Sequence, residues 1–64
     1  MKRERLLKTL RNEAKQRGVS FTLARQGGKH EVWAFGDSKV SIPRHRDIAE
    51  GTAKGIIDDC TKGT

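Results

Sequence analysis

Apolar residues near the start of the chain recur at helical spacing. Leu6, Leu10 and Ala14 are four residues apart, so they form one stripe along a helix. The residues around them include Lys, Arg, Glu and Gln, which favour helices, and neither Gly nor Pro interrupts the stripe. We therefore predict a helix over residues 3–16. Gly18 is expected to end it, because glycine readily adopts the left-handed conformation that often follows a helix.

The middle of the chain changes to the two-residue alternation of β-strands. Three strands are predicted, over residues 20–25, 29–35 and 39–42. Gly27-Gly28 and Gly36-Asp37 separate them, and the second pair is typical of a tight hairpin. Pro43 is expected to end the third strand, because it has no N–H to donate to a neighbouring strand.

Helical spacing returns towards the end of the chain. Ala53, Ile56 and Cys60 are separated by three and four residues, which predicts a second helix over residues 52–60. Thr52 is the expected N-cap, because its hydroxyl can accept a hydrogen bond from a free amide of the first turn.

The predicted order is helix, strand, strand, strand, helix. The simplest arrangement that buries both helical stripes is an α+β fold, a three-stranded antiparallel sheet with both helices on one face. The other face of the sheet would remain open to a partner. With 64 residues the chain has room for one domain, over residues 1–64.

The composition favours a nucleic acid or an acidic protein as the partner. Lys and Arg number 14 against 8 Asp and Glu, which gives a net charge of +6. A charge of this size on so short a chain attracts polyanions such as a nucleic-acid backbone. Only 33% of the residues are apolar. We therefore expect a thin core and a functional site on the surface rather than in a deep pocket.

Cysteine usage and the chain start favour a cytoplasmic protein. Cys60 is the only cysteine and cannot form an internal disulfide, whereas small secreted domains usually depend on disulfides. The charged start is not followed by a long apolar segment, so we expect no signal peptide. No segment approaches the roughly 20 apolar residues of a membrane helix.

His30 is the strongest candidate for chemistry. Strand alternation places it on the side opposite Trp33 and Phe35, and that bulkier side should face the helices. His30 should then stand on the open face of the sheet. Cations close to it in sequence are expected to bind phosphate, namely Arg25, Lys29, Lys39 and Arg44.

A basic stripe lies beside the apolar stripe of the first helix. Lys8, Arg11 and Lys15 share the spacing of three and four residues. Such a run is usually only a solvated face. On this basic chain it is also a candidate for phosphate contact.

These residue types suit RNA cleavage. A base must remove the 2′-hydroxyl proton, a cation must stabilise the crowded phosphate, and an acid must protonate the leaving oxygen. Histidine titrates near neutrality and can act as either base or acid. His45 is the supporting candidate for a second proton transfer, provided that the fold brings the strand ends together. The alternative is that both histidines are ordinary surface residues.

We expect neither a metal nor a cofactor. Two histidines fifteen residues apart and one distant cysteine make no zinc pattern. No carboxylate cluster suits magnesium, and Gly27-Gly28 falls far short of a phosphate-binding loop. Cys60 lies on the apolar stripe of the second helix, so we expect it to pack in the core rather than react.

Three motifs resemble the HicA family of toxins from bacterial and archaeal toxin–antitoxin systems. They are Gln26-Gly27-Gly28-Lys29-His30 after the first strand, Ile42-Pro43-Arg44-His45 at the end of the third, and Gly51-Thr52 before the last helix. Together with the element order, their spacing extends the resemblance over nearly the whole chain.

The resemblance implies a double-stranded-RNA-binding-domain-like fold and an mRNA interferase, an endoribonuclease that cuts mRNA without a metal. It also implies a HicB-like antitoxin that covers the active surface and silences the enzyme. The family's catalytic histidine falls on His30, and its Pro-x-His histidine falls on His45.

The chain departs from the family pattern in three places. Lys29 stands where the family usually has a small residue, the hairpin at Gly36-Asp37 is shorter, and residues 60–63 differ from the usual apolar ending. Two other functions stay open. One is a non-catalytic RNA-binding module that uses the basic helix faces, and the other is an inactive toxin relative that only binds a protein partner.

Overall fold

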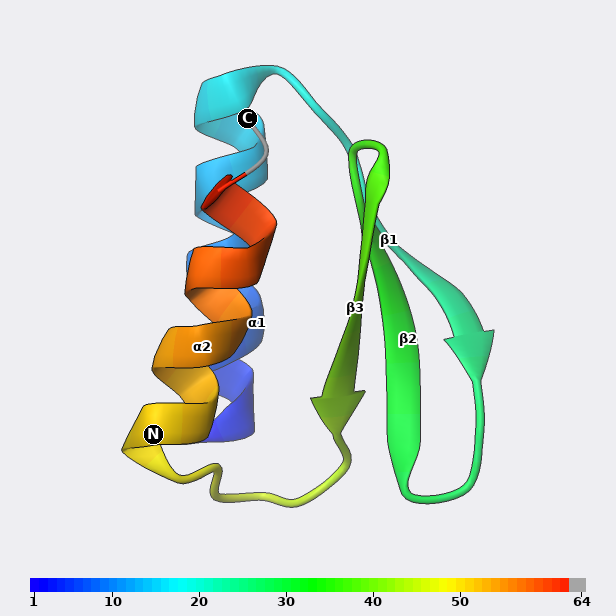
Figure 1. Ribbon diagram of the computed structural model, residues 1–64, viewed down its shortest axis with the longest axis vertical. Helices are drawn as coiled ribbons and strands as arrows, with labels where there is room; N and C mark the ends of the chain where they lie inside the picture. The colour runs from blue at the N-terminus through cyan, green and yellow to red at the C-terminus, as the bar shows by residue number, and fades with distance from the viewer. Residues whose placement is uncertain (63–64) are drawn as a thin grey trace.

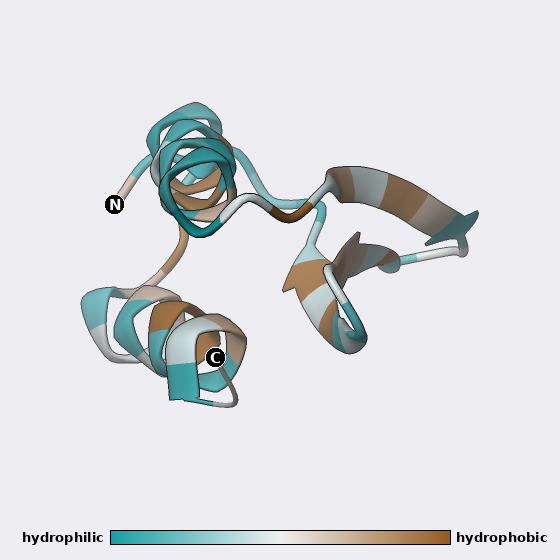
Figure 2. Ribbon diagram, turned by 90° about the horizontal axis from the view of Figure 1, so that it is seen from above, coloured by the Kyte–Doolittle hydropathy of each residue, from teal (hydrophilic) through white to brown (hydrophobic). Residues whose placement is uncertain are grey.

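The structure, a computed structural model, describes residues 1–62 and has the predicted order of elements (Figure 1). These are α1 (Arg3–Arg17), β1 (Phe21–Gln26), β2 (His30–Phe35), β3 (Ser38–Pro43) and α2 (Glu50–Lys62). The strands form one antiparallel sheet in the order β1-β2-β3. Both helices lie on the same side of this sheet (Figure 2), which confirms the predicted α+β fold. Gly63, the last residue of the atypical ending, and Thr64, the last of the predicted domain, lie outside the described residues.

α1 begins and ends within one residue of its predicted bounds. Its apolar stripe of Leu6, Leu10 and Ala14 is buried against the rest of the fold. Gly18 follows the helix with φ of 69°, and its N–H donates to the carbonyl of Lys15 at 3.2 Å. The left-handed glycine thus satisfies a free carbonyl of the last turn, as the sequence predicted.

The hairpin between β2 and β3 also follows the prediction. Phe35 lies opposite Ser38, so Gly36-Asp37 is a two-residue turn. Gly36 has φ of 59°, whereas no non-glycine residue described by the structure has a positive φ. A positive φ at the first turn position only is the type II′ geometry, which matches the natural twist of paired strands.

β1 contains one residue more than its pairing with β2 requires. Leu23 lies opposite Trp33 and Arg25 lies opposite Val32, so Ala24 has no partner of its own. This is a β-bulge. Because cross-strand partners share a face, Leu23 lies on the helix side of the sheet and Arg25 on the open side. Unbroken alternation would have put both on the same face.

The core fills the space between the helices and the inner face of the sheet. Its largest fully buried side chains come from every element except β1, namely Phe35, Leu6, Leu10, Ile42 and Cys60. The ring of Phe21 stacks on Trp33 with 4.7 Å between centroids and 16° between planes, which extends the packing to β1. β1 is less covered beyond Phe21, since its next apolar side chain towards the helices, Leu23, is 43% exposed.

The start of α2 was predicted wrongly. The helix begins at Glu50, so Thr52 lies inside its first turn and is not the N-cap. The carbonyl of Ala49 already accepts the N–H of Ala53 at 2.9 Å. The preceding segment is held by the N-terminus, since the Ile48 N–H donates to the Met1 carbonyl at 2.7 Å and the Ile48 side chain is buried. This tertiary anchor starts the helix earlier than local capping preference would.

Candidate active site

The side chains of β2 alternate between the core and the open face of the sheet. Glu31 and Phe35 are buried, with 7% and 0% of their surface exposed, and both belong to the inward series. His30 belongs to the other series and is exposed at the first position of the strand. The imidazole therefore stands on the side of the sheet that the helices leave uncovered, as expected from the sequence.

The nearest cross-strand neighbours of His30 have no polar side chains. On β3 its partner is Pro43. Towards β1, the N–H of Gly27 donates to the His30 carbonyl at 3.2 Å. No hydrogen bond of the His30 side chain joins it to another described residue. The imidazole is accordingly flanked by a glycine and a proline, which leave its ring nitrogens available to a ligand.

Two cations share the open face with His30. Arg25 lies opposite Val32 and Lys39 lies opposite Ala34, so both are on the same face as the histidine. Both are exposed, and neither forms a hydrogen bond or ion pair within residues 1–62. Uncommitted cations around an exposed imidazole make this face attractive to an anion.

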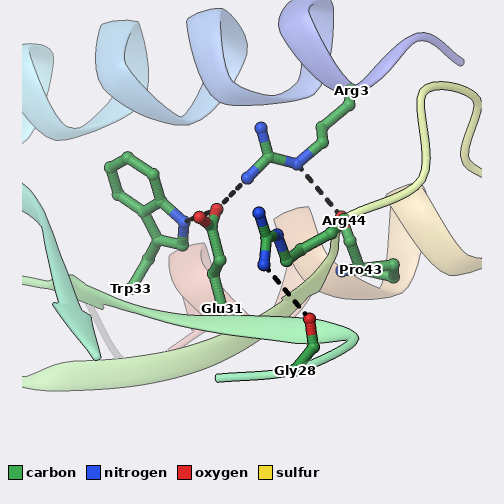
Figure 3. A network of polar contacts seen from close by, with 6 residues as sticks. All are labelled: Arg3, Gly28, Glu31, Trp33, Pro43 and Arg44. Atoms are coloured by element: carbon green, nitrogen blue, oxygen red, sulfur yellow. Dashed lines mark hydrogen bonds and ion pairs between the residues drawn. The ribbon is translucent and has the colours of Figure 1, made fainter. Parts of the chain in front are cut away.

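Lys29 and Arg44 lie at the same end of the sheet as His30 and are joined by a hydrogen bond of their backbones. The Arg44 N–H donates to the Lys29 carbonyl at 3.0 Å, which continues the β2–β3 pairing one step past Pro43. The Arg44 guanidinium donates to the Gly28 carbonyl at 3.2 Å and pins the glycine turn (Figure 3). Arg44 thus has a structural task in addition to its charge.

His45 follows directly after this contact and is exposed. Since Arg44 is bound to Lys29, the backbone of His45 lies at the same end of the sheet as His30. The strand ends therefore meet, which was the condition for His45 to assist His30.

The basic stripe of α1 lies on another surface. Lys8, Arg11 and Lys15 are exposed on the helix, away from its buried stripe. α1 packs on the inner side of the sheet (Figure 2), whereas His30 belongs to the outward series of β2. The structure thus separates the predicted phosphate-binding cations: Arg25 and Lys39 lie on the open face, Lys29 and Arg44 lie at the end of the sheet, and the α1 stripe lies on the helix layer.

An ion pair on the helix side of the sheet stabilises the end that carries His30, and the sequence did not predict it. The Arg3 guanidinium, at the start of α1, pairs with the Glu31 carboxylate (Figure 3). The same carboxylate oxygen accepts the Trp33 indole N–H at 3.3 Å, and Arg3 Nε donates to the Pro43 carbonyl at 3.1 Å. A charged residue in the inward series of β2 was the available signal, but its partner lies 28 residues away.

No three His, Cys, Asp or Glu side chains among residues 1–62 gather closely enough to hold a metal ion. Over the same residues, no helix has both the length and the apolar character that crossing a bilayer requires.

Comparison with protein-family models, with curated proteins and with solved structures gives no match.

Proposed function

We propose that the protein is a metal-independent endoribonuclease that cuts mRNA on the open sheet face, with His30 as its acid–base group. The observation that carries this proposal is the exposed imidazole of His30 on the same face as the uncommitted cations Arg25 and Lys39. Lys29 and Arg44 add positive charge at the same end of the sheet as His30. The resemblance to the HicA toxins supports the same activity and adds a HicB-like antitoxin as the partner that silences it in the cytoplasm.

The reaction needs only groups of this kind. The neutral imidazole of His30 removes the proton from a ribose 2′-hydroxyl, and the 2′-oxygen attacks the adjacent phosphorus. The bond from phosphorus to the 5′-oxygen breaks, and that oxygen takes up a proton from an imidazolium, either His30 itself or His45. The products are a 2′,3′-cyclic phosphate and a 5′-hydroxyl. General acid–base help of this type is worth roughly 10²–10⁴-fold in rate.

The open face favours binding through the RNA backbone rather than through stacked bases. The chain has no Tyr, and its only Trp and two Phe residues belong to the inward-facing series of β1 and β2. Proteins that stack bases use aromatic side chains for the purpose. We therefore expect steep salt dependence of binding and a weak base preference of cleavage.

The decisive experiment is cleavage of a defined mRNA by the wild-type protein in EDTA. The cleavage rate in EDTA should equal the rate without EDTA, because no step uses a metal. The His30→Ala protein should be folded by far-UV circular dichroism and should cut at least about 100-fold more slowly. Expression of wild-type protein, but not of this variant, should arrest growth. Undiminished cutting by His30→Ala would disprove the mechanism, and dependence on added Mg²⁺ would disprove its metal-free character.

A non-catalytic RNA-binding module is the second candidate, supported by the exposed stripe of Lys8, Arg11 and Lys15 on the helix layer. Such a module would retain RNA uncut, and replacement of the stripe would weaken binding while replacement of His30 would not. The third candidate, an inactive toxin relative, would bind an acidic antitoxin but not RNA.

A further inference from the structure

We infer that Arg25 is the catalytic cation of this site, the group that stabilises the phosphate while His30 moves the proton. This inference rests on the proposed ribonuclease function and goes beyond it, because it identifies one cation among several. It is derived from the register of the sheet rather than from closeness in sequence.

The β-bulge determines the side on which Arg25 lies. Leu23 is opposite Trp33 on the helix side, and two residues later Arg25 is opposite Val32 on the open side, because Ala24 is the extra residue between them. Val32 is two residues from His30 along β2. Arg25 is therefore the diagonal neighbour of His30, and diagonal neighbours lie about 7–8 Å apart. A phosphodiester fits between side chains that extend from positions this far apart.

The other cations are less well placed. Lys39 is opposite Ala34, four residues along β3 from Pro43, which is about 13 Å at the rise of a strand. Lys29 precedes His30 and by alternation lies on the opposite side of the ladder. The backbone of Arg44 is hydrogen-bonded to that of Lys29, and its guanidinium already donates one N–H to the Gly28 carbonyl. Arg25 alone of these four combines the correct face, diagonal proximity and a side chain with no partner among the described residues.

The chemistry of the guanidinium suits the role. Attack by the 2′-oxygen gathers additional negative charge on the two non-bridging phosphate oxygens. A guanidinium presents parallel N–H donors that match two such oxygens, and it stays charged throughout the pH range of the reaction. It donates no proton to the products, so the proton balance of the reaction remains with the histidines.

The test measures single-turnover cleavage of a defined RNA in EDTA at saturating protein, together with the Kd for the same RNA blocked by a 2′-deoxy nucleotide at the cut. Arg25→Ala should lower the cleavage rate about 100-fold, the usual cost of losing a charge-stabilising donor. Its Kd should change only a few-fold.

Two matched variants separate the effect of the position of Arg25 from the effect of the net charge of the protein. The exchanged variant Thr22→Arg/Arg25→Thr keeps the composition and the net charge of the protein, and its arginine is still at an exposed position of β1. The arginine now lies opposite Ala34 instead of Val32, which is two residues further along β2 from His30. This variant should remain as slow as Arg25→Ala. Lys54→Ala removes the same charge from an exposed position on α2 and should cut at the wild-type rate. Free guanidinium ion should partly restore Arg25→Ala and leave His30→Ala inactive.

The outcomes distinguish this inference from the proposal beneath it. If His30→Ala is inactive while Arg25→Ala or the exchanged variant cuts within about threefold of wild type, Arg25 is not the catalytic cation and the ribonuclease function stands. If His30→Ala still cuts at the wild-type rate, the proposed function itself is lost.

Discussion

The buried ion pair of Arg3 and Glu31 gives the sharpest test of how this small fold is held together. The Glu31 side chain is 10% exposed and the Arg3 side chain 23%, so the pair is largely withdrawn from water. Replacing Arg3 by Met keeps much of the side-chain volume. It leaves the carboxylate with the Trp33 indole N–H, at 3.3 Å, as its remaining partner in the described chain.

The magnitude follows from the contacts that are lost. Arg3 donates from its charged guanidinium to the Glu31 carboxylate and to the Pro43 carbonyl, and a hydrogen bond of a charged group contributes about 1.5–3 kcal/mol. Removing one member of a fully buried pair costs about 3–5 kcal/mol. Because some water reaches Arg3, we expect Arg3→Met to lower the free energy of unfolding by about 3 kcal/mol. For a domain of this size, that corresponds to a fall in Tm of roughly 12–24 °C.

A double-mutant cycle isolates the pair itself. Glu31→Leu should cost less than Arg3→Met, because the freed guanidinium can turn to water whereas a freed carboxylate cannot. The combined Arg3→Met/Glu31→Leu protein should cost only about 1 kcal/mol, since apolar replacement of a buried pair is often close to neutral. The coupling would then be at least 2 kcal/mol.

Urea denaturation followed by far-UV circular dichroism measures all four proteins. Two results would refute the reasoning. One is an Arg3→Met protein within about 0.5 kcal/mol of wild type, which would mean that the contact contributes nothing. The other is a double variant whose cost equals the sum of the single costs, which would mean that Arg3 and Glu31 act independently.

Two further predictions concern the thiol and the turns. Burial in the core, aided by Asp59, raises the pKa of Cys60 from 9.0 to about 11, so its alkylation by iodoacetamide at pH 8 should be about 100-fold slower in the folded protein than in urea. Because the folded state holds this proton more tightly, the free energy of unfolding should fall as pH rises from 9 to 11, and Cys60→Ser should reduce that fall. Gly18→Ala and Gly36→Ala both force alanine into a positive φ and should each cost about 1–2 kcal/mol in urea denaturation. Gly36→Ala should cost more, because its new methyl would lie 3.3 Å from Val19 Cβ, whereas a methyl at Gly18 would have no atom within 4 Å. Equal costs for the two variants would contradict this packing argument.

Periodicity predicted the elements of this protein well because it reflects local geometry. The stripe of α1, the alternation of β2 and the Gly36-Asp37 hairpin each depend on residues a few positions apart, and each is present where the sequence placed it. The same alternation correctly assigned His30 to the open face. These features need no knowledge of distant partners.

Features that depend on distant partners were beyond the sequence pattern. α2 starts at Glu50 rather than Thr52 because residues 46–48 are tied to the N-terminus. The buried carboxylate of Glu31 is balanced by Arg3, which no spacing rule connects to it.

The sequence by itself determined the elements, the open face and the histidine that stands on it. Only the tertiary structure decided which cation joins that histidine. Strand alternation, continued without a break, would have put Arg25 on the side of Leu23, and the unpaired Ala24 reverses that assignment. The physical reason is that a bulge arises from the pairing of two strands. Its position is therefore a property of β1 and β2 together and cannot be read from either segment alone.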